Sequence, residues 1–498
     1  NRFNTRFGVE YFLGEKSSLT GTVLYRKSTG NNISTNTIEE FDVNKVLTGL
    51  GTRIETSERD DETLEYSLNF TQDFKNAGHK LTFDVQYSES VEDDKAYIED
   101  EFDERNFTDE KNKEWLFKGD YTLPLGEDAL FEFGFKINLD DLDTDYLVED
   151  FENGEFVTNT NFSNTLNFNQ NVYSVYTQYG SKKNKFSYLL GLRMENTDRK
   201  IDLLQTSETY TKNFTELFPT VNLGYEISEG ESITLGYSKR LRRPRHWFLN
   251  PFESRTSETY ITKGNINLDP TYSNSFDLGW LKRWNKFTLN SSIYYQHSTN
   301  NFEMVLDEEI RDVNGEPTLV IIRSPINLST SDRFGFEFTA NYNPFKWWRL
   351  SNSFNFYKYK TDGEYNNISY DADDTSWFTR LTSRVRLPGK IDWQTRGMYI
   401  APRESAVSER DAMFMLNLAF SKDVFKEKGT LSLNVSDLLN SRKRKSTSIT
   451  PRTISEGEFQ WRERSITLNF TYRFNQKKQR ARQRGGYDDE GGMEEMYK

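Results

Sequence analysis

The feature that most constrains this chain is a two-residue alternation of apolar and polar side chains that recurs from end to end. Successive side chains of a β-strand point to opposite faces of the sheet, so each alternating segment predicts a strand with one apolar and one polar face. Residues 81–88 and 466–474 show the pattern. Residues 131–139 repeat it, with Phe131, Phe133, Phe135, Ile137 and Leu139 set between Glu132, Gly134, Lys136 and Asn138.

The composition excludes a helical membrane protein but is compatible with a membrane barrel. Hydrophobic residues make up 35% of the chain and the mean hydropathy is -0.81. No segment approaches the run of about 18 or more apolar residues that a transmembrane helix requires. A barrel strand needs apolar residues only at every second position, and barrels carry aromatic girdles at both membrane interfaces. The aromatic content of 15%, with 38 Phe and 27 Tyr, fits such girdles.

The predicted connections alternate between short turns and long polar segments. The short turns are residues 14–17, 75–80, 124–128, 181–185, 228–231, 283–286, 343–346, 388–390 and 422–429. The long polar segments are residues 27–59, 91–113, 141–169, 196–213, 240–271, 299–332, 361–375, 402–411 and 440–460. Outer-membrane barrels have short periplasmic turns and longer extracellular loops. The chain is therefore predicted to be an all-β, transmembrane antiparallel β-barrel in a bacterial outer membrane, with the short turns and C-terminus in the periplasm.

The strand count predicts an incomplete barrel. We count 19 strands over residues 1–475, and both the first and the last run toward the short-turn side. Single-chain bacterial barrels have an even number of strands and both ends in the periplasm. An odd number of strands is thus expected before Asn1. Three such strands would give 22, the size of the plugged transporter barrels.

Three motifs resemble a known family. They read FPTVNLGY at 218–225, YSKRLRRPRHWFLNPF at 237–252 and GNINLDPTYSNSFDLG at 264–279. Their order and content are similar to the outer-membrane β-barrel family of TonB-dependent receptors found in Bacteroidota. The resemblance extends over most of the chain, as far as Phe474. The residues that carry the second and third motifs are Arg243, Pro244, Asn250, Pro251, Gly264, Asn265 and Pro270.

The resemblance implies a function as well as a fold. It implies an upstream carboxypeptidase-regulatory-like domain, a plug and three more strands, and uptake of a large or scarce solute driven by the TonB system through the plug. Residues 1–498 show no plug or TonB box, and 24 residues follow Phe474. The alternative is a non-transporting structural or accessory subunit of an outer-membrane assembly. The expected surroundings are outer-membrane lipid and lipopolysaccharide.

The sequence offers little for catalysis or nucleic-acid binding. It has no cysteine, and none of its three histidines, His79, His246 and His297, lies beside a nucleophile motif. We therefore expect no enzyme activity. The net charge of -13 argues against nucleic acid as the partner.

Two groups of charged residues are candidate ligand sites. Asp140, Asp141, Asp143 and Asp145 are predicted to lie in an extracellular loop, where oxygen ligands suit Ca²⁺. The alternative is a solvated loop without a cofactor, because no EF-hand spacing is present. On a predicted pair of strands, Arg380, Arg384, Arg386 and Arg396 share the polar face. They form either an anionic ligand path or a structural lane paired with carboxylates or the plug.

Two further basic segments have open interpretations. The Arg-rich stretch around Arg243 is expected to be structural, and binding of lipopolysaccharide phosphate is the alternative. Residues 476–498 change from a basic run to an acidic one. Low hydrophobicity with blocks of charge predicts a flexible, solvated periplasmic tail. The alternative is a docking peptide for an outer-membrane or periplasmic protein.

Overall fold

The computed structural model describes residues 1–474 except 43, 100–102, 258, 314–315, 367, 406–407 and 450–453. Its main sheet contains 22 strands, of which β7 (Glu155–Thr158), β12 (Glu253–Ser257) and β13 (Tyr260–Lys263) are short additions. The remaining 19 agree with the predicted count. They are β1 (Arg2–Gly14), β2 (Ser17–Phe41), β3 (Leu47–Asp73), β4 (Lys80–Glu99), β5 (Glu104–Pro124), β6 (Ala129–Glu152), β8 (Asn164–Lys183), β9 (Phe186–Leu203), β10 (Glu208–Ser228), β11 (Glu231–Arg242), β14 (Thr271–Arg283), β15 (Phe287–Val313), β16 (Glu316–Phe345), β17 (Trp348–Asp362), β20 (Ala372–Leu387), β21 (Ile391–Ile400), β24 (Met413–Val424), β25 (Gly429–Ser436) and β28 (Ser465–Tyr472).

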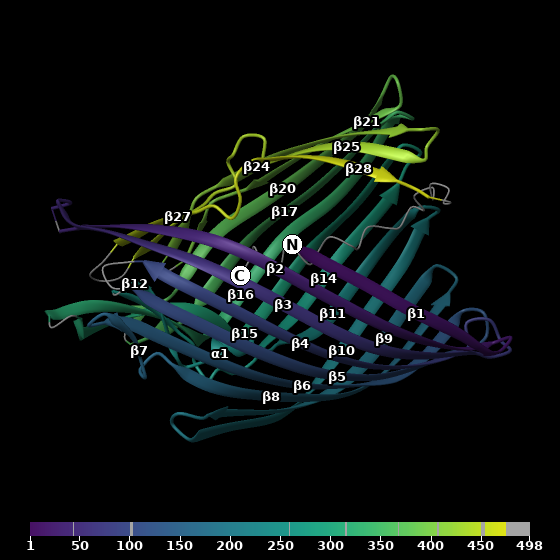
Figure 1. Cartoon of the computed structure of the whole chain (residues 1–498). Helices are drawn as coiled ribbons and strands as arrows, with labels where there is room; N and C mark the ends of the chain where they lie inside the picture. Colours follow the sequence, from purple (N-terminus) through teal and green to yellow (C-terminus); the bar gives the residue numbers. More distant parts are fainter. Residues whose placement is uncertain are drawn as a thin grey trace. The chain divides into compact units, whose positions relative to one another are not determined.

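The chain forms two compact units. Unit 1 comprises residues 1–279, 294–334 and 360–371, and unit 2 comprises residues 280–293, 335–359 and 372–498. In unit 1, β1 to β6 lie side by side in chain order (Figure 1), and the order continues through β8, β9, β10 and β11. In unit 2, β20, β21, β24, β25 and β28 pair in the same antiparallel manner.

The register of unit 1 separates an apolar from a polar face, as the alternation predicts. One row across β4, β5, β6, β8, β9 and β10 consists of Phe83, Gly119, Phe135, Val175, Met194 and Leu217. The adjacent row, on the opposite face, consists of Asp84, Lys118, Lys136, Ser174, Glu195 and Glu216. Phe83, Val175, Met194 and Leu217 are exposed although apolar, as residues that face lipid are in a membrane barrel. The predicted fold class is confirmed, whereas three further strands remain a prediction.

Several predicted long loops are strands. β2 and β3 pair without a gap from Ser17↔Gln72 to Glu40↔Gly49, so only residues 42–46 connect them. Residues 204–207 alone connect β9 and β10. The loops predicted at 27–59 and 196–213 are therefore wrong. The hydropathy of a strand falls where the strand leaves the lipid, after the 9–11 or so residues that cross a bilayer. The backbone hydrogen bonds between neighbouring strands continue beyond that point in water, so the strands are longer than their apolar segments.

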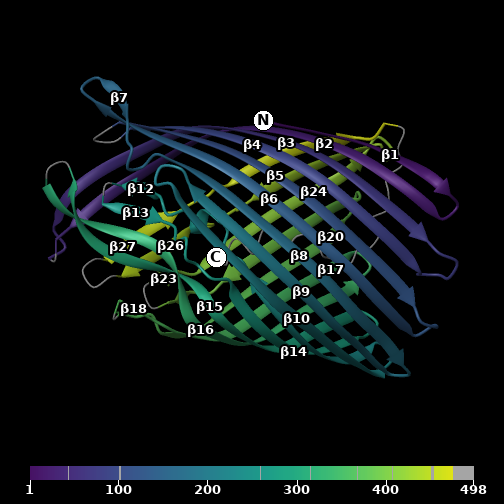
Figure 2. The same ribbon diagram turned by 90° about the horizontal axis from the view of Figure 1, so that it is seen from below.

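The opposite ends of the strands have the nine short turns that were predicted. The β8–β9 turn is built on Asn184, whose positive φ of 54° is a conformation that Asn tolerates better than most residues. Figure 2 shows β7, β12 and β13 together at the other end of the unit 1 strands.

The smaller elements lie in the connections. They are α1 (His246–Leu249), the β18–β19 pair (Glu364–Tyr365 and Ile368–Ser369), and a four-stranded sheet of β22 (Arg403–Glu404), β23 (Ser408–Arg410), β26 (Arg444–Ile449) and β27 (Ile454–Phe459). Over the described residues, none of the helices has the length and apolar character to span a membrane.

Candidate functional site

The connection between β11 and β14, residues 243–270, folds back onto the polar face of unit 1, and we call it the anchored loop. Its first residue, Arg243, donates from Nη2 to Glu195 Oε2 at 2.6 Å and from Nε to Thr197 Oγ1 at 3.0 Å. Arg193 forms a second ion pair with Glu195. Glu195 and Thr197 are alternate residues of β9 on the face opposite Met194, so the loop begins on the polar face.

The middle of the loop is closed by backbone hydrogen bonds. The Gly264 amide donates to Asn250 O at 2.8 Å, and the Asn265 amide donates to Phe248 O at 2.7 Å. A Cβ added to Gly264 would lie 2.2 Å from Asn250 O, so this close approach requires glycine. Pro244 is buried where β11 has ended at Arg242. Proline lacks the N–H that continued strand pairing would need.

Two leucines fix the loop to the wall by burial. Leu249 of α1 and Leu268 are both 0% exposed. They belong to a cluster with five side chains from β6, β8 and β9, namely Leu142, Leu166, Phe168, Ile201 and Leu203. Fully burying a leucine contributes about 1.5–3 kcal/mol relative to leaving it exposed, so these contacts are a major part of what holds the loop in place.

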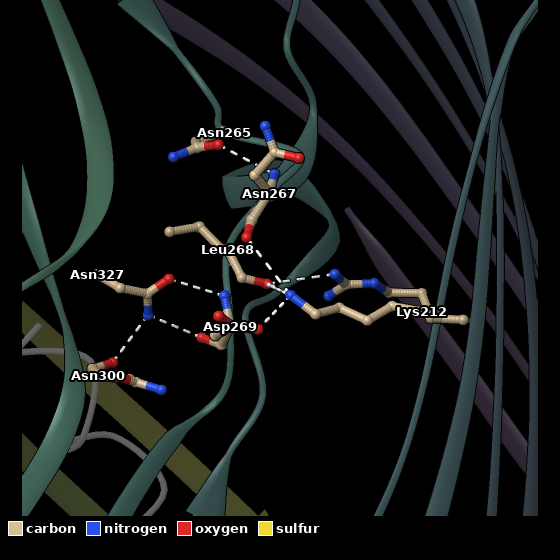
Figure 3. Close-up of polar contacts among 8 residues, drawn as sticks. Lys212, Asn265, Asn267, Leu268, Asp269, Asn300 and Asn327 are labelled. Atoms are coloured by element: carbon tan, nitrogen blue, oxygen red, sulfur yellow. Dashed lines mark hydrogen bonds and ion pairs between the residues drawn. The ribbon is translucent and has the colours of Figure 1, made fainter.

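A network of polar contacts holds the end of the loop (Figure 3). Leu268 O accepts from Arg199 Nη2 at 3.3 Å and from Lys212 Nζ at 3.4 Å, and Lys212 also forms an ion pair with Asp269. On the other side, Asn327 accepts from the Asp269 amide at 2.7 Å and donates at 2.9 Å to the carbonyls of Asp269 and Asn300. Burial lowers the pKa of Arg199 to about 10.

The hairpin of the loop is joined to β15 and β16. Arg311 of β15 binds Glu253 of β12 through two hydrogen bonds of 2.7 and 2.9 Å. These bonds hold the pKa of Glu253 below its usual value. β13 pairs in parallel with β16 from Tyr260↔Ile321 to Thr262↔Arg323. The loop is thus tied to strands before and after it in the chain.

The structure brings together most of the motif residues. Arg243, Asn250, Gly264 and Asn265 each make the contacts that shape the loop, and Pro270 is buried just before β14. Pro251 follows Asn250, whose Oδ1 accepts from the Phe252 amide. Sequence reasoning missed Arg199, Lys212 and Asn327. The hydrogen bonds of Asn327 to Asp269 join residues 58 apart in the chain, and no local pattern marks such a contact.

The four candidate arginines of unit 2 share one face, as predicted. The β20–β21 register places Arg396 opposite Thr382, which alternates with Arg380, Arg384 and Arg386. Arg384 donates to Gln394 Oε1 and Arg386 to Asp392 Oδ1, each at 2.9 Å. Arg384 and Arg386 therefore already have cross-strand partners. Their role as a ligand path remains a prediction.

The candidate calcium residues lie in a strand and not in a loop. Asp140, Asp141, Asp143 and Asp145 belong to β6, so Asp140 is on the face opposite the other three. Asn167 Nδ2 donates to Asp143 Oδ1 at 2.8 Å. Among the described residues, no group of three or more acidic or histidine side chains is placed to hold a metal ion. Residues 476–498 lie outside the described residues.

The fold and the anchored loop define an outer-membrane β-barrel. A family model described as the outer membrane protein beta-barrel family matches residues 72–472, and the chain belongs to this family. No curated protein matches the sequence.

Three solved structures share the fold. The ferric-catecholate import receptor Fiu from E. coli K12 is 10% identical, with a TM-score of 0.60, over 95% of this chain and 80% of that one. The copper transporter OprC is 11% identical, with a TM-score of 0.64, over 95% and 74%. The siderophore receptor PiuA from Acinetobacter baumannii is 12% identical, with a TM-score of 0.59, over 94% and 79%.

Proposed function

We propose that this chain is the barrel portion of an outer-membrane receptor that takes up a large or scarce solute, with energy from the TonB system acting through a plug. The observation that carries the proposal is the anchored loop. It folds onto the polar face of the sheet and is held there by ion pairs, hydrogen bonds and two buried leucines. A fixed loop of this kind narrows the polar interior of a barrel and presents polar groups to a solute.

The proposal includes an orientation. The nine short turns are placed in the periplasm, and the anchored loop and the extended ends of β2 to β10 are placed outside the cell. In this orientation a solute reaches the loop before it reaches the membrane-spanning part of the barrel. A ferric-catecholate import receptor, a copper transporter and a siderophore receptor share this fold.

Two other ligand and partner assignments belong to the same proposal. One face of the β20–β21 pair offers guanidinium donors to an anionic solute, from Arg380, Arg384, Arg386 and Arg396. Residues 476–498 serve as a periplasmic contact for a protein partner.

Copurification from the native membrane tests uptake. The full-length protein is purified in mild detergent, and bound solutes and partner proteins are identified by mass spectrometry. Accumulation of the identified solute is then compared between a deletion strain, a complemented strain and a strain with Asn327→Leu. Loss of accumulation in the deletion strain, with an intermediate level in the variant, supports uptake. Unchanged accumulation, with altered abundance of copurifying outer-membrane proteins, contradicts uptake and supports an assembly subunit.

A further inference from the structure

A recess of about 490 Å³ lies on the wall of unit 1. Tyr237 of β11, Asn274 and Phe276 of β14, and Tyr295 and His297 of β15 line it. The rings of Tyr237 and Phe276 are 4.8 Å apart, and those of Phe276 and Tyr295 are 6.5 Å apart and nearly parallel. The three aromatic rings thus lie side by side across β11, β14 and β15, and we call them the aromatic platform.

The recess opens on the apolar face of the sheet. Tyr237 is opposite Val221, which is opposite Leu190 of β9, so all three share the face of the exposed apolar residues. The other face is identified by Gly236, because a Cβ there would meet the Asp277 carboxylate at 2.3 Å. Asp277 therefore packs on the polar face, and its neighbour Phe276 faces outward.

The height of the recess corresponds to a membrane interface. A barrel strand crosses the bilayer in about 9–11 residues. Tyr295 and His297 are the ninth and eleventh residues of β15, counted from the short turn at Phe287. Phe276 and Asn274 are the eighth and tenth residues of β14, counted back from Arg283. In the proposed orientation this is the level of the outer-leaflet head groups.

Two polar side chains at the edge of the recess, Asn274 and His297, carry hydrogen-bonding groups. Asn274 Oδ1 accepts from the Tyr237 hydroxyl at 3.0 Å, and no described residue is a partner of the Asn274 NH₂ group. His297 Nδ1 lies 2.8 Å from Asp332 Oδ1, which also accepts from the Tyr295 hydroxyl at 2.6 Å, and within the described part of the chain His297 Nε2 has no partner. An aromatic platform with a few fixed polar groups suits a ring that has one apolar face and hydroxyls on its edge.

We propose that this recess binds a sugar ring of an outer-leaflet glycolipid, the lipopolysaccharide of the surrounding membrane. The sugar's C–H face stacks on Phe276 and Tyr295, and its hydroxyls meet Asn274 and His297. The acyl chains continue down the apolar face, past Leu278, which is exposed. The inference rests on the proposed orientation but not on uptake.

Lipid binding by the full-length protein tests the inference. The protein is reconstituted in phosphatidylethanolamine nanodiscs and titrated with lipopolysaccharide that carries core sugars, and the bound lipid is measured by native mass spectrometry. Phe276→Ala and Tyr295→Ala are compared with the wild type. Val175→Ala is the matched control, because it removes an exposed apolar side chain from the same face of unit 1 at a similar height, the ninth residue of β8 counted back from Lys183, and Val175 does not line the recess. Loss of one aromatic contact of about 1.4 kcal/mol corresponds to roughly tenfold weaker binding.

Each outcome decides the inference. Tenfold weaker lipopolysaccharide binding in both platform variants, with the control unchanged, supports it. Equal binding by wild type and platform variants overturns it. Equal retention of phosphatidylethanolamine and lipopolysaccharide also overturns it and places the recess in the inner leaflet, which contradicts the orientation. Binding of the free core oligosaccharide as tightly as the intact glycolipid overturns the membrane source in favour of a soluble glycan. Solute accumulation is expected to stay normal in all variants, so failure here is distinct from failure of the uptake proposal.

Discussion

At the scale of single residues, the position of the anchored loop depends on side chains whose contacts another residue type could not make. Gly264 is required because the backbone carbonyl of Asn250 occupies the space of a Cβ. Asn327 serves three backbone groups at once, which a shorter or apolar side chain does not do. Glu253 joins the hairpin to β15 through a bidentate contact, the geometry in which carboxylate and guanidinium match best.

Gly264→Ala is expected to destabilise the anchored loop. The new Cβ would meet Asn250 O at 2.2 Å, and overpacking of this kind costs about 1–3 kcal/mol. Limited proteolysis of the purified protein, read by mass spectrometry, should show faster cleavage within residues 250–264. Gly51→Ala is the control, because a Cβ at Gly51 meets nothing within 4 Å. Equal cleavage in the two variants would contradict the close approach.

The Glu253–Arg311 contact is expected to make the loop sensitive to acid. The folded pKa of Glu253 is lowered, chiefly by the hydrogen bonds from Arg311. Its stabilising contribution is therefore present above the ordinary Glu pKa of about 4.3 and is lost as the pH falls through the lower, folded value. Hydrogen exchange of residues 253–263, measured between pH 6 and pH 3 and corrected for intrinsic rates, should report loosening only at the acid end. Glu253→Gln should be loose at every pH, and an acid transition that persists in this variant would assign it to another group.

Asn327→Leu is expected to free the end of the loop. The Asp269 amide and the Asp269 and Asn300 carbonyls lose their side-chain partner, at a cost of roughly 1–3 kcal/mol for each group that stays buried. The Asp269 amide should exchange with solvent faster than in the wild type. Asn171→Leu offers a matched control, because among the described residues the Asn171 side-chain amide donates to one side chain, that of Asn169. Unchanged exchange at Asp269 would show that the ion pair with Lys212 is sufficient by itself.

At the scale of elements, the sequence predicted the strands, their facing and their short turns. The reason is physical, because lipid requires an apolar residue at every second position, and the pattern ends where the lipid ends. The far ends of the strands were not predictable in this way. β2 and β3 continue to Phe41 and from Leu47 through polar residues, since a ladder in water needs no apolar face. The acidic β6 segment has the composition of a loop for the same reason, although it is a strand.

The facing of β6 predicts unequal tolerance of charge. Phe133 is exposed on the apolar face, five residues into the strand and near the expected midplane. Phe133→Arg should cost about 2–4 kcal/mol, the penalty for arginine at the midplane of a barrel's lipid face. Thr122→Arg is the control on the polar face, where Thr122 is opposite Glu132. Unfolding in lipid vesicles by urea measures both, and equal losses would count against the assignment of faces.

At the scale of the whole molecule, the family motifs mark the residues of the anchored loop but not the residues of the wall that hold the loop in place. Arg243, Gly264 and Asn265 could be selected from the sequence because they recur together in a recognisable order. Arg199, Lys212 and Asn327 could not, because each belongs to an ordinary alternating strand and acquires its role only when the loop folds back. For a related reason, no pattern in the sequence predicts the recess at Phe276. An outward aromatic residue looks the same in sequence whether its neighbours form a flat girdle or a hollow.

The orientation of the barrel gives the prediction with the widest consequence, because uptake, the glycolipid recess and the tail all depend on it. The chain has no cysteine, so a single introduced thiol can be labelled without background. Ser207 lies in the β9–β10 connection and Asn184 in the β8–β9 turn, at opposite ends of β9. On intact cells, a membrane-impermeant maleimide should label Ser207→Cys and should leave Asn184→Cys unlabelled until the outer membrane is permeabilised. Both residues are exposed and have positive φ, so the two sites are matched in accessibility and in backbone conformation. Labelling of Asn184→Cys alone on intact cells would invert the molecule, and the anchored loop would then face the periplasm, where it could not meet an external solute first.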